Sequence, residues 1–267
     1  MKNLICYILL LSSLNTWAQT TNQTDTNELK QGMWEKTSPE GKPIYKGEFK
    51  DGKPVGKWKR YHTNGMLRAQ LNYGENSDSC AVILFDNQGK KIAEGTYVDE
   101  LREGKWLFFR SMLKISEENY LKGKKDGVTA TFYDTGELMS ECNFTNGTAN
   151  GAYRAYHKTG TVYFECMMRD GMRDGYCQSF FNSGAKESTG YYEKSIREGN
   201  WEYFHEDGSK AYTLIYKGGL VTNTAVSDSI NNLRLINMEK NAKQIVDPEK
   251  FIDNPNGYMQ NMRNQQR

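Results

Sequence analysis

Hydrophobic and polar residues alternate in short runs along most of the chain, as they do in strands that bury one face. Between Leu67 and Tyr73, for example, Leu, Ala, Leu and Tyr alternate with Arg, Gln and Asn. A short run rich in aromatic and β-branched residues precedes each alternating run, and glycine-containing turns separate the two. The pattern predicts β-hairpins joined in series.

The hairpin pattern recurs every 24 residues, apart from a fourth unit that is one residue short, and eight units cover residues 32–222. Position 10 is glycine in seven units, and positions 6 and 18 are each aromatic in seven units. Position 3 holds all four tryptophans that follow residue 18, namely Trp34, Trp58, Trp106 and Trp201. Position 1 of the eight units falls at Gly32, Gly56, Cys80, Gly104, Gly127, Gly151, Gly175 and Gly199.

A single hairpin cannot bury its apolar face alone, so neighbouring hairpins must stack. The expected fold is therefore all-β, an elongated array of eight β-hairpin repeats. Positions 3 and 6 have opposite parity, which leaves two alternatives for their aromatic residues. Either a β-bulge re-aims one of them, or the sheet carries aromatic side chains on both faces.

The two ends of the chain differ from the repeats. Residues 1–18 resemble a secretory signal peptide, with an apolar stretch from Leu4 to Leu14 and cleavage expected near Ala18. The mature protein is then extracytoplasmic, either periplasmic or secreted; an uncleaved N-terminal anchor is the alternative. Residues 19–31 are expected to be a flexible lead-in. Residues 223–267 are expected to form a short helical cap, begun by Ser227 or Asp228, and a polar tail.

Three ten-residue segments show the repeat best: GKWKRYHTNG (56–65), GAYRAYHKTG (151–160) and GNWEYFHEDG (199–208). They resemble the MORN-repeat variant family, and the resemblance covers residues 32–222. Bacterial members are often labelled YwqK-type antitoxins, and MORN repeats elsewhere serve as scaffolds, dimerisation surfaces and contacts to anionic lipid. Cys80 at position 1 of the third unit and Leu113 at the turn of the fourth depart from the family pattern.

The polar residues do not assemble a recognisable reactive site. The three histidines all occupy position 7, in units two, six and eight, which places them too far apart for a zinc site or a catalytic dyad: His62, His157 and His205. Acidic residues such as Asp126, Asp174 and Glu198 fall in turns rather than facing each other. We therefore expect no catalytic, cofactor or metal site, and no enzyme.

Four cysteines follow the apolar N-terminal stretch, and none forms a C-x-x-C pair: Cys80, Cys142, Cys166 and Cys177. Cys142 and Cys166 both occupy position 16 on the apolar face, where a small hydrophobic residue is expected. Cys166 and Cys177 fall on adjacent strands, and export would permit a disulfide between them. We expect free thiols in the core, with the disulfide as the alternative.

Composition narrows the partners. A net charge of +2 without a run of Lys or Arg lacks the basic surface that nucleic acid requires. No later segment is apolar enough to span a membrane. We expect a non-catalytic exported binding or scaffold protein that presents its sheet to a protein partner or the cell envelope. The alternatives are an antitoxin-like immunity protein that neutralises a toxin by protein–protein binding, and a carbohydrate- or lipid-binding module. Open sheet edges are compatible with self-association, and the binding residues are unknown at this stage.

Overall fold

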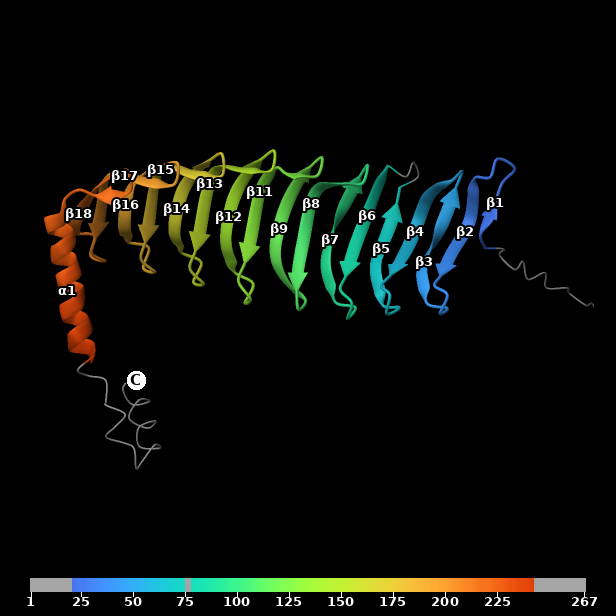
Figure 1. Cartoon of the computed structure of the whole chain (residues 1–267), viewed down its shortest axis with the longest axis horizontal. Coiled ribbons are helices and arrows are strands. Elements are labelled where there is room, and N and C mark those ends of the chain that lie inside the picture. The colour runs from blue at the N-terminus through green and yellow to red at the C-terminus, as the bar shows by residue number, and fades with distance from the viewer. Residues whose placement is uncertain (1–20, 75–77, 243–267) are drawn as a thin grey trace, which may run out of the picture. The chain divides into compact units, whose positions relative to one another are not determined.

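The computed structural model describes residues 21–74 and 78–242, so the signal-peptide prediction and the tail after residue 242 lie outside the described part. The chain divides into two compact units, residues 1–136 and 137–267. Each unit is built almost entirely of antiparallel β-strands (Figure 1). The all-β prediction is confirmed, together with a single C-terminal helix.

The first unit contains eleven strands, which are β1 (Gln23–Thr24), β2 (Lys30–Thr37), β3 (Pro43–Lys50), β4 (Lys53–Tyr61), β5 (Leu67–Tyr73), β6 (Ser79–Phe85), β7 (Lys91–Val98), β8 (Leu101–Arg110), β9 (Leu113–Leu121), β10 (Lys124–Lys125) and β11 (Gly127–Phe132). Each strand from β1 to β8 pairs with the next, and β9 pairs with both β10 and β11.

The second unit contains eight strands and a helix, which are β12 (Leu138–Thr145), β13 (Thr148–Tyr156), β14 (Val162–Arg169), β15 (Met172–Phe180), β16 (Lys186–Glu193), β17 (Ile196–Phe204), β18 (Lys210–Lys217), β19 (Leu220–Val221) and α1 (Thr224–Ala242). Its strands also pair in chain order. A repeat thus supplies one hairpin, and its second strand pairs with the first strand of the next repeat.

Both faces of the sheet carry aromatic side chains, which resolves the parity question. In seven hairpins the register shifts between positions 5 and 6 of the first strand. The bulge lies in the second strand: Arg60 opposes Ala69, but Tyr61 opposes Leu67, so Arg68 is the extra residue. The first strand itself is regular, so the side chains at positions 5 and 6 point to opposite faces of the sheet. The position-6 ring of Tyr156 lies on the face opposite the tryptophans, where its hydroxyl donates to Glu141.

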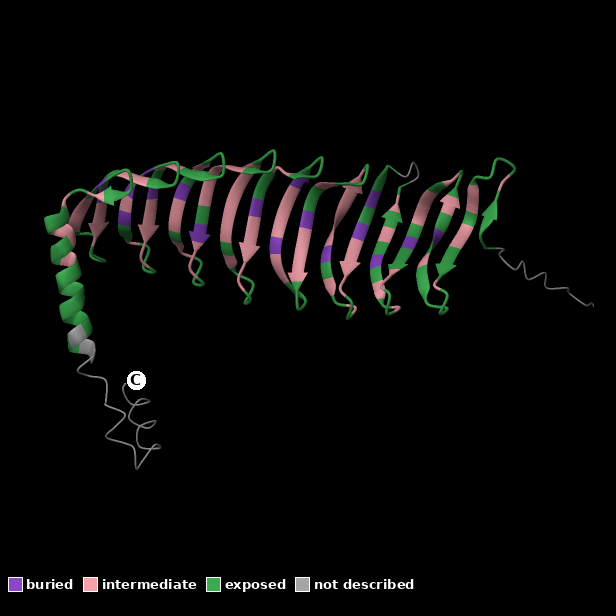
Figure 2. Ribbon diagram, in the orientation of Figure 1, coloured by how far each residue is buried: buried purple, intermediate pink, exposed green. Residues whose placement is uncertain are grey.

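The core occupies one face of each unit, which we call the packed face. Within residues 21–74 and 78–242, all the buried side chains fall at positions 1, 3, 5, 14, 16 and 18, numbering the shortened fourth repeat by its structural equivalents. Figure 2 colours the buried residues purple along the strands. Trp106 is completely buried there, and its ring makes edge-to-face contacts with Tyr97 and Tyr120 at centroid distances of 4.9 and 6.4 Å. The opposite face, carrying positions 2, 4, 6, 15 and 17, is the open face.

Position 16 of one repeat and position 3 of the next meet on the packed face, and we call them a junction pair. Where position 3 is tryptophan in the second, fourth and eighth repeats, position 16 before it is glycine: Gly47 with Trp58, Gly95 with Trp106 and Gly190 with Trp201. A Cβ at any of these glycines would lie closer than 3.0 Å to the indole ring. Each indole N–H donates to the carbonyl that follows the glycine, at 3.0 to 3.1 Å. Size complementarity thus selects glycine opposite tryptophan.

The departure of Cys80 from glycine has a structural reason. At the junctions that contain glycine at position 1, the register slips beside position 16, and Gly56 takes a φ of 62° that a side chain would strain. Between β5 and β6 the register is uninterrupted, and the junction pair is Leu71 with Val82. Without the bulge, position 1 needs no left-handed backbone, and Cys80 is accommodated and buried.

The lead-in expected to be flexible contains an ordered strand. Within residues 21–31, β1 pairs with β2, and Trp34 donates its indole N–H to the carbonyl of Gln23 at 3.1 Å. The first tryptophan has no preceding repeat, so the lead-in supplies the carbonyl that the earlier hairpin provides elsewhere.

The C-terminal helix starts earlier than expected, because Asn223 rather than Ser227 or Asp228 precedes its first turn and accepts the Val226 amide through its carbonyl. The Asn223 side chain also bonds the main chain of β18, at Ile215 N and Thr213 O, both 2.8 Å away. The Asn223 side chain therefore makes hydrogen bonds to an amide and a carbonyl on the edge of β18 that a further strand would otherwise make.

Most of α1 does not cover the sheet. Residues 231–238 are all exposed, so the apolar side chains of Leu233 and Ile236 are in contact with solvent. No helix in the described residues is long and apolar enough to cross a bilayer.

Candidate functional site

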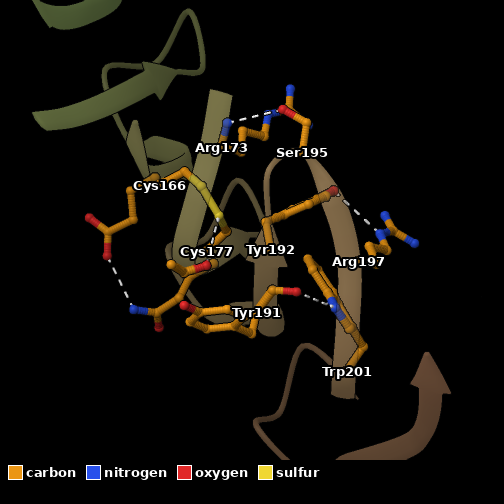
Figure 3. The surroundings of a disulfide bond; sticks show 11 residues. Cys166, Arg173, Cys177, Tyr191, Tyr192, Ser195, Arg197 and Trp201 are labelled. Carbon is orange, nitrogen blue, oxygen red and sulfur yellow. Dashed lines mark hydrogen bonds between the residues drawn. A yellow bond between two sulfur atoms is a disulfide. The ribbon is translucent and has the colours of Figure 1, made fainter. Parts of the chain in front are cut away.

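The disulfide of the second unit occupies a junction pair. Cys166 and Cys177 lie directly opposite each other on β14 and β15, with their Cα atoms 4.2 Å apart, and their sulfurs are bonded (Figure 3). The expectation of free thiols at these two positions was wrong. The sequence predicted that the two cysteines lie on adjacent strands. That they face each other directly depends on the register of β14 and β15, which shifts only after Cys166. The bond takes the place that glycine and tryptophan occupy at other junctions.

Polar groups on the packed face are used for packing. The guanidinium of Arg197 contacts the hydroxyls of Tyr192, Tyr203 and Tyr216 and lies over the ring of Trp201, 4.5 Å from its centroid. Burial alone would lower the pKa of Arg197, but the tyrosine hydroxyls outweigh it and raise that pKa. Burial also raises the pKa of Tyr203. The guanidinium and the three hydroxyls bond to one another over the Trp201 ring, so this cluster packs the core.

The histidines connect neighbouring repeats. His62 places Nε2 3.0 Å from the carbonyl oxygen of Phe85, and His157 places Nε2 3.4 Å from that of Phe180. A carbonyl can only accept, so Nε2 carries the proton in both rings. Each bond runs from position 7 of one repeat to position 6 of the next. His205 belongs to the last repeat.

The turn acids also have structural partners. Glu198 accepts the Gly218 amide at 2.7 Å, Asp174 pairs with Arg169 at 3.4 Å, and the Asp126 amide donates to a neighbouring strand. Across residues 21–74 and 78–242, no three His, Cys, Asp or Glu side chains converge as a metal site would require.

The open face carries rows of charged side chains. Position 15 is acidic in four consecutive repeats, at Glu94, Glu117, Glu141 and Glu165. Two of these acids, Glu94 and Glu117, pair with a lysine at position 12 that also lies over the position-6 aromatic ring of the next repeat. Lys91, for example, lies 3.1 Å from Glu94 and 4.0 Å from the centroid of Phe109. Exposed ion pairs of this kind contribute little to stability, so residues on the open face can differ between repeats at little cost to the fold.

A groove of about 940 Å³ interrupts these rows in the first unit. Its lining includes open-face residues of β4 to β7, where side chains form two rows across the strands. One row is Lys57, Asn72, Ala81 and Thr96, and the other is Lys59, Gln70, Ile83 and Glu94. Small residues at Ala81 and Thr96 leave space between the longer ones. A hollow of this volume is within the range of ligand sites.

The groove has a positive end. Lys46 on β3 lies directly opposite Lys59 on β4, a like-charge arrangement that destabilises a sheet. Lys46 is partly compensated by Glu35 at 3.4 Å. Among the described residues, Lys57 and Lys59 have neither an ion pair nor a hydrogen bond, and the carboxamides of Gln70 and Asn72 are likewise unbonded. We take this group of exposed lysines and amides, which no other described residue bonds, as the candidate site.

The second unit has a different feature at the same open-face positions. Tyr176 is 73% exposed and meets Tyr191 edge to face, with centroids 5.5 Å apart. Asn200 and Glu198 border this notch, and Met167 and Ile215 extend the exposed apolar row to either side. Large exposed aromatic residues beside polar groups mark contact surfaces.

None of these open-face residues was predicted from the sequence to bind a partner. The Lys57–Lys59 and Gln70–Asn72 pairs were visible as alternating polar positions, but identical alternation occurs wherever one face is solvated. Only the register shows that two lysine-bearing strands and two amide-bearing positions adjoin a hollow.

The fold defines a β-hairpin repeat protein whose open face is exposed to solvent. The model of the MORN repeat variant family matches three segments of the chain, residues 54–74, 125–146 and 197–217. The expected resemblance is confirmed for these segments, and repeats of this type suit a binding or scaffold role.

Comparison with whole proteins adds little. No curated protein matches the chain. A solved structure titled "Crystal Structure of TarM" aligns with 42% of this chain at 11% identity and a TM-score of 0.19. The match spans only 18% of that structure's chain, and it carries no argument about function.

Proposed function

We propose that this chain is an exported, non-catalytic binding or scaffold protein whose open face holds a protein partner outside the cytoplasm. The main support for the proposal is the difference between the two faces of the sheet. The packed face is filled by junction pairs and aromatic contacts, whereas the open face of the first unit keeps unpaired lysines and amides beside a 940 Å³ groove. Polar groups of the packed face bond to one another, whereas those at the groove are exposed and are bonded by no other group of the described residues.

The apolar N-terminal stretch supports export. The test is an affinity capture from envelope extract with residues 19–267 as bait, followed by mass spectrometry. A stoichiometric protein partner is expected. A bait that retains no protein above a scrambled-surface control would refute a stable protein scaffold, and a toxin among the captured proteins would favour the antitoxin-like alternative.

A carbohydrate-binding role is the second candidate, favoured by the exposed Tyr176 and Tyr191 rings beside Asn200. Exposed aromatic rings stack on sugar faces while an amide bonds hydroxyls. A glycan array probed with the protein and with Tyr176→Ala tests it; signals unchanged by the substitution would exclude the notch as a sugar site.

A further inference from the structure

We propose that the groove of the first unit binds an extended acidic peptide segment in which two carboxylates alternate with other residues, as in Glu-x-Glu. The proposal rests on the proposed function, since it names the chemistry of the partner that the open face would hold. The candidate residues are Lys57, Lys59, Gln70 and Asn72, with Lys46 beside them.

The spacing of the lysines matches an extended chain. Lys57 and Lys59 are two residues apart on β4 and point to the same face, so their stems are about 6.8 Å apart. Side chains at i and i+2 of an extended peptide have the same separation. A Glu-x-Glu segment aligned with β4 would therefore bring one carboxylate to each ammonium group.

The neighbouring strand presents groups suited to a peptide backbone. Asn72 lies opposite Lys57, and Gln70 lies opposite Lys59, about 4.8 Å away across the β4–β5 pairing. A carboxamide both donates and accepts, as does a peptide unit, and neither amide has a hydrogen bond within the described residues. The small Ala81 and the apolar Ile83 then leave room for uncharged side chains.

Charge favours an anion at this end of the groove. Lys46 and Lys59 are direct cross-strand neighbours, and only Lys46 has a carboxylate partner. Two carboxylates would neutralise Lys57 and Lys59 and relieve this repulsion. At the other end of the groove, the carboxylate of Glu94 on β7 already pairs with Lys91 at 3.1 Å. The positive charge of the groove is therefore concentrated at β4, and the acidic residues of the peptide should lie there.

The experiment is a fluorescence-anisotropy titration of residues 19–267 with the labelled peptide Gly-Thr-Glu-Val-Glu-Thr-Gly. The second peptide has the same composition with adjacent glutamates, Gly-Thr-Val-Glu-Glu-Thr-Gly. Removing both lysines by Lys57→Gln and Lys59→Gln is expected to weaken binding of the first peptide about tenfold, the sum of two exposed ion pairs. Raising the salt concentration should weaken the wild-type complex in the same direction.

A matched control removes two other exposed lysines from the same hairpin junction. Lys50 and Lys53 oppose each other on β3 and β4 but lie outside the groove, so Lys50→Gln with Lys53→Gln lowers the net charge equally. Both double variants replace exposed side chains, and matching circular dichroism spectra with cooperative melting curves verify that they fold. The control variant is expected to bind like the wild type.

Equal loss in both double variants, equal affinity for both peptides, or no peptide binding up to about millimolar concentration would overturn the proposal. Binding of polygalacturonate in place of the peptide, sensitive to Lys57 and Lys59, would overturn the peptide class and identify an acidic glycan. The outcome is separable from the proposed function. A partner captured equally by the wild type and the groove double variant leaves the scaffold role standing while the groove assignment fails.

Discussion

The complementarity of glycine and tryptophan at the repeat junctions predicts a sharp dependence of stability on a single methyl group. Gly95 lies under the buried indole of Trp106, and a Cβ added there would approach the ring more closely than 3.0 Å. The φ of Gly95 is not in the left-handed region, so alanine strains no backbone angle. The cost of Gly95→Ala is therefore steric.

The magnitude follows from two opposing contributions. Forcing a methyl group into a packed core costs about 1–3 kcal/mol, because the indole must leave its edge-to-face contacts with Tyr97 and Tyr120. Replacing glycine by alanine at a compatible backbone returns about 0.4–1 kcal/mol by restricting the unfolded chain. We expect a net loss of about 1–2 kcal/mol in the wild type. When Trp106→Val removes the ring, the same substitution should be neutral or stabilising.

The assay is a double-mutant cycle of Gly95→Ala and Trp106→Val, with unfolding in urea followed by circular dichroism. Trp106→Val alone should cost about 3–5 kcal/mol, as other large deletions in cores do. The expected interaction energy between the two sites is about 2 kcal/mol, favouring the double variant over the sum. Additive effects within about 0.5 kcal/mol, or stabilisation by Gly95→Ala in the wild type, would refute the steric argument.

Three further predictions concern the core and the repeat connections. Replacing Cys166 and Cys177 by serine should lower the unfolding free energy by about 2–3 kcal/mol, and reductant should reproduce the loss in melting curves of the wild type but not of the variant. His62→Ala removes a bond to the next repeat and should cost about 0.5–1.5 kcal/mol in urea unfolding, whereas His205→Ala, in the last repeat, should be neutral. Burial raises the pKa of Tyr120 above its ordinary value of 10.0, so the unfolded chain ionises first. Its contribution is complete below pH 10.0 and should disappear as pH rises through the folded-state pKa, which alkaline unfolding of the wild type and Tyr120→Phe would show; identical alkaline midpoints would contradict it.

The hairpin repeat could be predicted because each recurring residue type constrains the backbone. Glycine at position 10 and aromatics at positions 6 and 18 mark turns and strands wherever they occur. The junction pairs were also present in the sequence, but only as a relation between repeats. Position 16 taken alone varies among glycine, leucine, glutamate and cysteine.

The relation appears when each residue at position 16 is compared with the one eleven positions later. Glycine then precedes tryptophan three times, and Cys166 precedes Cys177 at the same separation of 11. The groove could not be predicted in this way, because it depends on the summed volumes of side chains from four strands. Helix α1 was predicted, but its exposed apolar residues were not, since hydrophobic spacing alone does not show what a helix packs against.

The division between packed and open faces leads to a final prediction that separates function from stability. Lys59 opposes Lys46, and like charges directly opposite each other destabilise a sheet by a few tenths to about 1 kcal/mol. Lys59→Gln should therefore raise the free energy of unfolding in low salt, and added salt should abolish the gain. The same substitution should weaken binding of the Glu-x-Glu peptide.

A lysine retained for packing would behave in the opposite way, with its loss lowering stability at every salt concentration. Urea unfolding at two salt concentrations, together with peptide titration, distinguishes the cases. If Lys59→Gln is more stable than the wild type and binds less peptide, the charge of Lys59 serves binding and lowers the stability of the sheet. A destabilised variant would mean that Lys59 belongs to the structure, and the groove would lose its strongest electrostatic argument.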